Sequence, residues 1–183
     1  KRILGLNFFC GVFTNISRNH LDYHKDFDDY ILTKKIFFDL LEKDSFAIIN
    51  KDDKYAETML LDCVAQKVFY SLKQDNATHQ ARVIENNLNG LVLEIDGEQV
   101  KTKISGIFNA YNLLAIYSVA IRIEKNKINV LVALGELKSV LGRFNIIKSS
   151  SGINAIIDYA HSPGAIATIF ESVSNMKTEN KKI

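Results

Sequence analysis

The spacing of apolar residues changes along the chain, and these changes predict an α/β fold. Short, nearly continuous apolar runs at 11–16 and 46–50 indicate buried strands of a parallel sheet. Apolar residues at helical spacing over 26–44 and 53–61 indicate helices that pack against those strands. This alternation of strand and helix is typical of a doubly wound sheet.

Beyond the second of these helices the apolar period becomes two, which favours antiparallel strands. We predict strands over 80–84, 91–95 and 99–104, with Asp96-Gly97 as a tight hairpin turn between the last two. The sheet is therefore expected to be mixed and largely parallel.

The last third of the chain predicts helices, then two strands, then a further helix that Pro163 opens at its first turn. The expected ranges are 107–123 and 128–140 for the helices, 144–148 and 153–158 for the strands, and 163–176 for the final helix. We place a domain junction near Leu141, which divides the chain into 1–141 and 142–183.

Composition excludes several classes of protein. With 47% hydrophobic residues the chain can bury a core, and a net charge of +2 is too small to favour nucleic acid as a partner. No apolar run is long enough to span a bilayer. Cys10 and Cys63 lack metal-ligand spacing, so we expect reduced thiols and a cytoplasmic location. The chain begins at Lys1 without a signal-type segment, and we expect an excerpt of a longer protein.

Two histidines follow the first predicted strand, where open α/β sheets bind their ligands. His20 and His24 stand four apart, but Leu21 replaces the glutamate of a zinc protease, so zinc is disfavoured. Mg²⁺ would take one histidine as a minority ligand beside carboxylates and water, and Asp22 is near. Hydrogen-bonded histidines that cap the next helix explain the pattern equally well.

Lys34 lies three and four positions from apolar and aromatic residues, on or beside the buried side of the predicted helix. Spacing alone favours a stem that packs on the core while the ammonium reaches water. The alternative is a desolvated, neutral amine that adds CO₂, because the resulting carbamate supplies oxygen ligands for a metal. Its neighbour Lys35 is expected to be an ordinary solvated lysine.

Four residues of the second half could contact a nucleotide. Asn109 and Asn112 open the helix over 107–123, where they could cap it or meet a nucleobase edge. Arg143 could clamp a phosphate or hold two domains together. Asp158 ends an apolar strand, where it could accept from ribose hydroxyls or cap a helix.

Taken together, these motifs resemble the Mur ligase family of peptidoglycan synthesis, and most closely its muramoyl-tripeptide synthetase branch. The resemblance runs from Arg2 to about Ala167. It rests on ordered spacing: Phe13-Thr14-Asn15, Ser17-Arg18, His20-Leu21-Asp22-Tyr23-His24, Tyr30 and Lys34. It implies that 1–141 form the C-terminal part of a Mur ligase central domain and that 142–183 begin a Rossmann-like C-terminal domain.

The resemblance implies ATP-dependent amide formation with Mg²⁺. The γ-phosphoryl group of ATP would pass to the carboxylate of UDP-MurNAc-L-Ala-D-Glu, and a diamino acid, meso-diaminopimelate or L-lysine, would attack the acyl phosphate. We expect a monomer with neither nucleic acid nor membrane as a partner. Closure near Leu141 would bring the second domain over the nucleotide.

The resemblance also implies roles for single residues, and it reverses the preference that spacing gave for Lys34. The roles are a carbamylated Lys34 and His20 at the metal, Asn109 and Asn112 on the adenine side, Arg143 at an ATP phosphate, Asp158 at the ribose, and Arg2 at the muramoyl substrate.

The sequence departs from the family pattern in three respects. Asn19 and Gly164 stand where the family usually has Asp, and no G-x-x-x-x-G-K-[ST] phosphate loop occurs. We therefore expect the isolated chain to be inactive and a longer parent to be a ligase. The alternatives are a folylpolyglutamate or cyanophycin-type ligase of the same superfamily, or a non-catalytic remnant.

Overall fold

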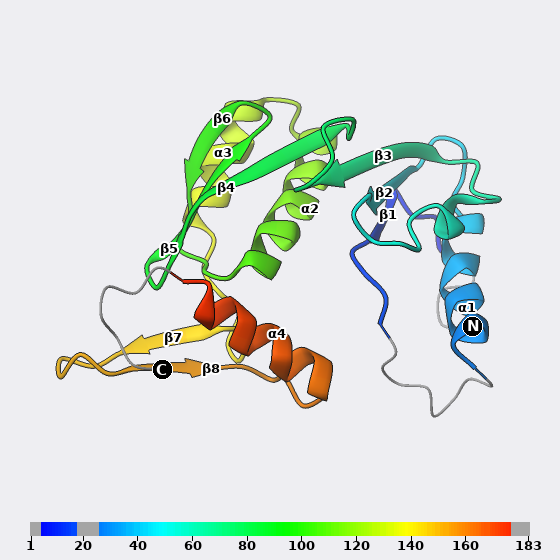
Figure 1. Cartoon of the computed structure of the whole chain (residues 1–183). Helices are drawn as coiled ribbons and strands as arrows, with labels where there is room; N and C mark the ends of the chain where they lie inside the picture. Colours follow the sequence, from blue (N-terminus) through cyan, green and yellow to red (C-terminus); the bar gives the residue numbers. More distant parts are fainter. Residues whose placement is uncertain (1–4, 18–25, 177–183) are drawn as a thin grey trace. The chain divides into compact units, whose positions relative to one another are not determined.

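The computed structural model describes residues 5–17 and 26–176 (Figure 1). The chain divides into two compact units, Lys1–Gln80 with Leu114–Ile123 and Ala81–Leu113 with Glu124–Ile183. A six-stranded sheet runs in the order β1-β2-β3-β4-β5-β6 with three parallel and two antiparallel pairings, and a separate hairpin is formed by β7 and β8. The predicted α/β class and mixed sheet are confirmed.

The first unit is built on parallel strands. Strands β1 (Cys10–Phe13), β2 (Phe46–Asn50) and β3 (Gln66–Ser71) pair in order, and β3 pairs with the start of β4 (His79–Asn87). Parallel strands are covered on both faces, and Ala47, Ile48 and Ile49 of β2 are accordingly fully buried. The predicted strand over 46–50 is confirmed, whereas the first strand ends earlier than predicted.

Helix α1 (Phe27–Asp39) follows the first strand and packs back on it. Its N-cap is Asp26, whose carboxylate accepts from the Asp29 backbone N–H at 2.8 Å. A Cβ on Gly11 of β1 would lie 2.7 Å from the Phe37 ring, so the aromatic side chain occupies the space that a methyl group would need.

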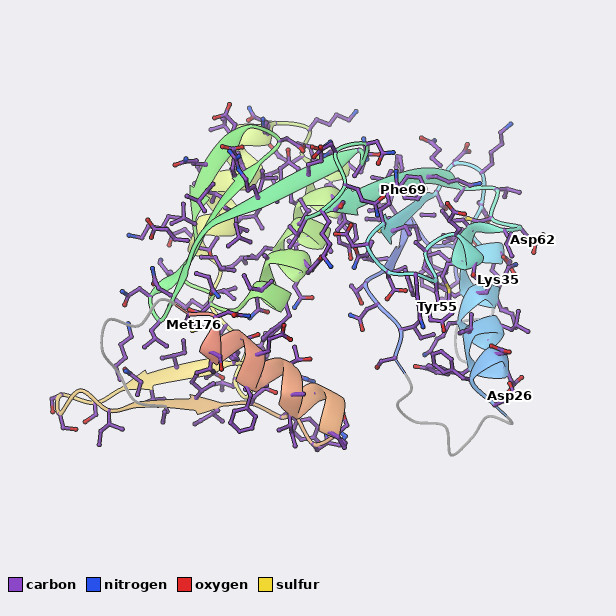
Figure 2. All side chains as sticks on the ribbon, in the orientation of Figure 1. Asp26, Lys35, Tyr55, Asp62, Phe69 and Met176 are labelled. Carbon is purple, nitrogen blue, oxygen red and sulfur yellow. The ribbon has the colours of Figure 1, made fainter. Side chains whose placement is uncertain are left out.

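An ion cluster centred on a buried lysine joins α1 to the segment before β3. Lys35 is 6% exposed, and its ammonium donates to both carboxylate oxygens of Asp39 at 2.8 Å and to Asp62 (Figure 2). The hydrogen bonds that Lys35 donates, first to Asp39 and then to Asp62, favour its charged form and raise the pKa of Lys35.

The predicted helix over 53–61 is wrong. The connection from β2 to β3 is made of turns and one short 3₁₀ helix, η2 (Thr58–Leu60). Asp53 accepts from the Tyr55 backbone N–H at 2.9 Å, a local bond that competes with helix formation. The apolar residues that suggested a helix over 53–61 include Met59 and Leu60, which are buried in the core although the segment that carries them is irregular.

The second unit is built on an antiparallel meander of β4, β5 (Gly90–Ile95) and β6 (Glu98–Lys101). Asp96 and Gly97 both have positive φ, 47° and 85°, as a two-residue type I′ hairpin requires. The predicted hairpin turn is confirmed.

The remaining elements follow the predicted order. Helix α2 (Ile107–Ile123) has the predicted bounds, whereas α3 (Lys127–Glu136) ends earlier than predicted. Strands β7 (Asn145–Lys148) and β8 (Asn154–Ile157) form an antiparallel hairpin, and α4 (Pro163–Ser174) follows it. Over 5–17 and 26–176, none of the helices has the length and apolar character that a bilayer crossing needs.

Gly90→Ala should strongly destabilise the second unit. Gly90 has φ +139°, and an added Cβ would lie 1.9 Å from the Thr102 carbonyl oxygen, so the β5–β6 ladder would have to move. Urea unfolding followed by circular dichroism should show a loss of about 3 kcal/mol or more. Gly97→Ala is the matched control, because φ is also positive there but no atom lies within 4 Å, and it should cost about 1–2 kcal/mol. Equal losses would contradict the steric argument.

Lys35→Met should change how stability depends on pH. Since folding raises the Lys35 pKa above 10.5, its stabilisation is fully present below that pH and is lost as the pH rises through the folded pKa. The difference in unfolding free energy between wild type and Lys35→Met should therefore stay constant from about pH 7 to 10 and shrink above it.

Lys35→Arg is the control for this experiment, because a guanidinium stays protonated over the whole range. A difference between wild type and Lys35→Met that does not change up to the pH of unfolding would refute the ion cluster as a stabilising contact.

Candidate functional site

The carboxyl ends of β1, β2 and β3 meet at one edge of the parallel sheet, where side chains tie them together. The Asn50 amide donates to the Thr14 carbonyl oxygen at 2.7 Å. The buried Tyr70 hydroxyl donates to the Phe13 carbonyl oxygen at 3.2 Å. These bonds hold the backbone at the end of β1, on the side from which the chain continues toward the histidine motif.

Two carboxylates that the sequence analysis missed organise the same edge. Asp53 accepts from the Ile16 backbone N–H at 3.3 Å. Asp52 accepts from the Ser71 hydroxyl at 2.6 Å and from the Leu72 backbone N–H at 2.9 Å. The sequence signal that could have identified them is the pair of acidic residues shortly after the buried strand β2. Their bonds to backbone groups indicate that they shape the loops.

Several predicted site residues lie outside the described part of the chain. These are Arg2, His20 and His24, and also Asn19, which departs from the family pattern. The described chain stops at Ser17 and resumes at Asp26, the N-cap of α1. The assignments of His20 to a metal and of Arg2 to the muramoyl substrate therefore stay predictions.

The structure reverses the expected environments of the two neighbouring lysines. Lys34 is exposed, with its ammonium 5.3 Å from the Tyr30 ring centroid, whereas Lys35 is buried. The buried side of α1 is formed by Ile31, Lys35 and Phe38, and Lys34 borders it, about 60° from Ile31 and about 40° from Phe38 around the helix. The prediction of a solvated Lys35 was wrong, and the desolvated environment considered for Lys34 is not found, whereas the position that spacing predicted for Lys34 beside the buried side is confirmed.

The chemistry of Lys34 fits a metal site under one condition. An ammonium repels a divalent cation, whereas the carbamate formed with CO₂ offers the oxygen ligands that Mg²⁺ prefers. An exposed amine is open to CO₂. No group of three or more His, Cys, Asp or Glu side chains that could hold a metal occurs among residues 5–17 and 26–176. A metal there would depend on the carbamate and on residues beyond that set.

The two predicted adenine-side residues are joined to each other at the start of α2. The Asn109 amide donates to the Ser105 carbonyl oxygen at 2.7 Å and accepts from the Asn112 amide at 3.0 Å. Asn112 is exposed. Asn109 thus fixes the first turn of the helix, and Asn112 is the more accessible of the two amides.

Arg143 and Asp158 lie together at the open end of the β7–β8 hairpin. The Asp158 carboxylate accepts from the backbone N–H groups of Phe144 at 2.8 Å and Ala160 at 2.7 Å. The exposed Arg143 guanidinium lies 5.6 Å from the Tyr159 ring centroid.

A ring contact links this hairpin to the adenine-side residues within the second unit. The rings of Phe108 and Phe144 meet edge to face at 5.3 Å, so the residues before Asn109 and after Arg143 touch. The structure therefore brings Asn109, Arg143 and Asp158 into one unit, while Lys34 belongs to the other. Gly164 lies in the first turn of α4, where a Cβ would meet nothing within 4 Å.

Comparison with known proteins identifies similar sequences over the whole chain. The model of the Mur ligase middle domain matches residues 1–120. A protein of Cytophaga hutchinsonii named UDP-N-acetylmuramoyl-L-alanyl-D-glutamate--2,6-diaminopimelate ligase is 43% identical over 183 residues, which are 100% of this chain and 37% of that protein. A protein with the same name from Parabacteroides distasonis is 43% identical over 94% of this chain, which covers 35% of that protein. A third, from Bacteroides fragilis, is 39% identical over the whole chain, which covers 38% of it.

Solved structures show the same fold at lower sequence identity. A structure of UDP-N-acetylmuramoyl-L-alanyl-D-glutamate--2,6-diaminopimelate ligase matches 96% of this chain and 37% of its own with a TM-score of 0.79 and 24% identity. MurF from Acinetobacter baumannii matches 92% of this chain and 38% of its own with a TM-score of 0.81 and 16% identity.

The chain spans a little more than a third of the length of the curated relatives that it matches. The family model covers well over half of the chain, and the matching structures agree with the α/β architecture described above. The expected Mur ligase fold is confirmed, and the chain belongs to the Mur ligase middle domain family.

Proposed function

We propose that the protein containing this chain is an ATP-dependent ligase that joins 2,6-diaminopimelate to UDP-N-acetylmuramoyl-L-alanyl-D-glutamate. The observation that carries this proposal is 43% identity over all 183 residues to a relative with that name. Diaminopimelate is favoured over L-lysine because the Parabacteroides and Bacteroides relatives carry the same name.

The proposed reaction has two steps. A carboxylate oxygen of the D-glutamyl residue attacks the γ-phosphorus of ATP, and ADP leaves. The amine of the diamino acid then attacks the acyl carbon, loses a proton and expels phosphate. Both steps develop negative charge on oxygen, so positive groups held in place stabilise their transition states. Mg²⁺, when bound, would neutralise charge on the phosphate oxygens.

The chain's own residues would divide this work between its two parts. Lys34, as a carbamate, and His20 would serve the metal, and Arg2 would contact the muramoyl substrate. Asn109 and Asn112 would contact the adenine, Arg143 a phosphate and Asp158 the ribose side. A junction near Leu141, with domains of 1–141 and 142–183, would let closure exclude water from the acyl phosphate. We further propose a cytoplasmic monomer without nucleic acid or membrane partners.

Lys34→Ala should abolish most activity of the full-length ligase. If the carbamate organises the metal, kcat should fall about 10²- to 10³-fold in an assay of phosphate release with both substrates and ATP. Acetate or formate should restore part of the activity, because each supplies carboxylate oxygens where the carbamate is missing.

Lys54→Ala is the matched control for Lys34→Ala. Lys54 is also exposed and its ammonium lies 4.8 Å from the Tyr55 ring centroid, but it has no proposed role. Full activity of Lys34→Ala, or equal losses in the two variants, would refute the carbamate.

The isolated 183-residue chain should show no ligation, because it carries no phosphate loop to hold the triphosphate. The assay is ATP-dependent coupling of radiolabelled diaminopimelate to the UDP-linked acceptor, with the full-length protein as the positive control. Measurable coupling by the chain alone would contradict this prediction.

A further inference from the structure

The ribose contact that the family resemblance implies for Asp158 leaves its observed hydrogen bonds unexplained. One carboxylate oxygen accepts from the Phe144 backbone N–H at 2.8 Å and the other accepts from the Ala160 backbone N–H at 2.7 Å. The Tyr159 backbone N–H donates to the Gly142 carbonyl oxygen at 2.8 Å. Two of these hydrogen bonds join the turn that carries Arg143 to the segment that follows β8, and the third holds the Asp158 carboxylate within that segment.

This turn has a backbone conformation that needs external support. Gly142 has φ +73°, which glycine adopts readily, but Phe144 has φ +52°, which a bulky L-residue adopts rarely. Such a residue persists only where its surroundings hold it. Phe144 is 2% exposed and its ring contacts Phe108, while its N–H is held by Asp158.

The side chain of Arg143 depends on the same segment. Its guanidinium lies 5.6 Å from the ring centroid of Tyr159, the residue next to Asp158, and the Tyr159 ring in turn meets His161 at 5.2 Å. The Asp158 carboxylate binds the N–H of Phe144, which follows Arg143, and the N–H of Ala160, which follows Tyr159. It therefore holds the backbone that carries the guanidinium against the backbone that carries its aromatic support.

We propose that Asp158 is a positioning residue for Arg143: its carboxylate holds the 142–144 turn so that the guanidinium meets the triphosphate in a fixed orientation. The inference rests on the proposed ligase function and assigns to Asp158 an effect on phosphate contact that does not pass through the ribose. Neutralising the carboxylate disrupts the turn, because a carboxamide has only one oxygen to accept the two N–H groups.

The test compares Asp158→Asn with wild type in the full-length ligase, using ATP and 2′,3′-dideoxy-ATP. Asp158→Asn should raise KM for the nucleotide and lower kcat/KM by about 10- to 100-fold, the range expected when a clamping group is misplaced. The same fold-loss, within about twofold, should occur with the dideoxy nucleotide, which has no ribose hydroxyl to contact.

A double-mutant cycle tests the connection to Arg143. In an Arg143→Ala background, Asp158→Asn should have little further effect, because the group that it positions is already gone. Additive losses, or a loss that disappears with 2′,3′-dideoxy-ATP, would overturn the inference and leave Asp158 as a ribose contact.

Amide hydrogen exchange supplies a measurement that does not depend on turnover. The N–H groups of Phe144 and Ala160 should exchange faster in Asp158→Asn than in wild type, and unchanged protection of both would also overturn the inference. Asn126→Ala is the matched control: it removes a side chain that accepts from the Asn129 backbone N–H at 3.2 Å in the same unit. This control should alter stability without changing KM. Absence of ATP-dependent ligation in the wild type would overturn the proposed function and this inference together.

Discussion

The parallel pairing of β1, β2 and β3 is the constraint on which the rest of the first unit depends. Parallel strands run in the same direction, so their carboxyl ends meet at one edge, and both faces must be covered. The covering helix α1 must therefore start near that edge and run back across the sheet. Hydrogen bonds from Asn50 and Tyr70 then fix the backbone at the end of β1. Through these bonds, strand pairing determines the course of the chain after β1, as far as Ser17.

Elements with strong apolar periodicity could be predicted closely from the sequence. The strand over 46–50 and the helix over 107–123 have the predicted bounds, and the Asp96-Gly97 turn has the predicted conformation. The segment over 53–61 could not be predicted in this way, because periodicity does not show the hydrogen bonds that Asp53 accepts from the Ile16 and Tyr55 backbone N–H groups.

The environment of Lys35 was predicted wrongly for a reason that hydropathy cannot supply, although the apolar side of α1 packs on the core as predicted. A lysine is expected on the solvent side, and Lys35 is buried only because Asp39 and Asp62 accept its hydrogen bonds. Asp62 lies 27 positions away in the sequence, so no local pattern pairs the two. The same limit applies to the candidate site. Motif spacing selected the candidate residues, but it could not predict the hydrogen bonds and ring contacts that hold them in place. The residues selected in this way are Lys34, Asn109, Arg143 and Asp158.

The glycine at position 11 gives the helix its distance from the sheet. The Phe37 ring rests where a methyl group on that strand would be, and Leu41 comes within 3.0 Å of the same point. A larger residue at this single backbone position would displace the Phe37 and Leu41 side chains, through which α1 and the residues after it rest on the strand. A residue with no side chain therefore determines how closely aromatic packing can bring this helix to the strand that precedes it.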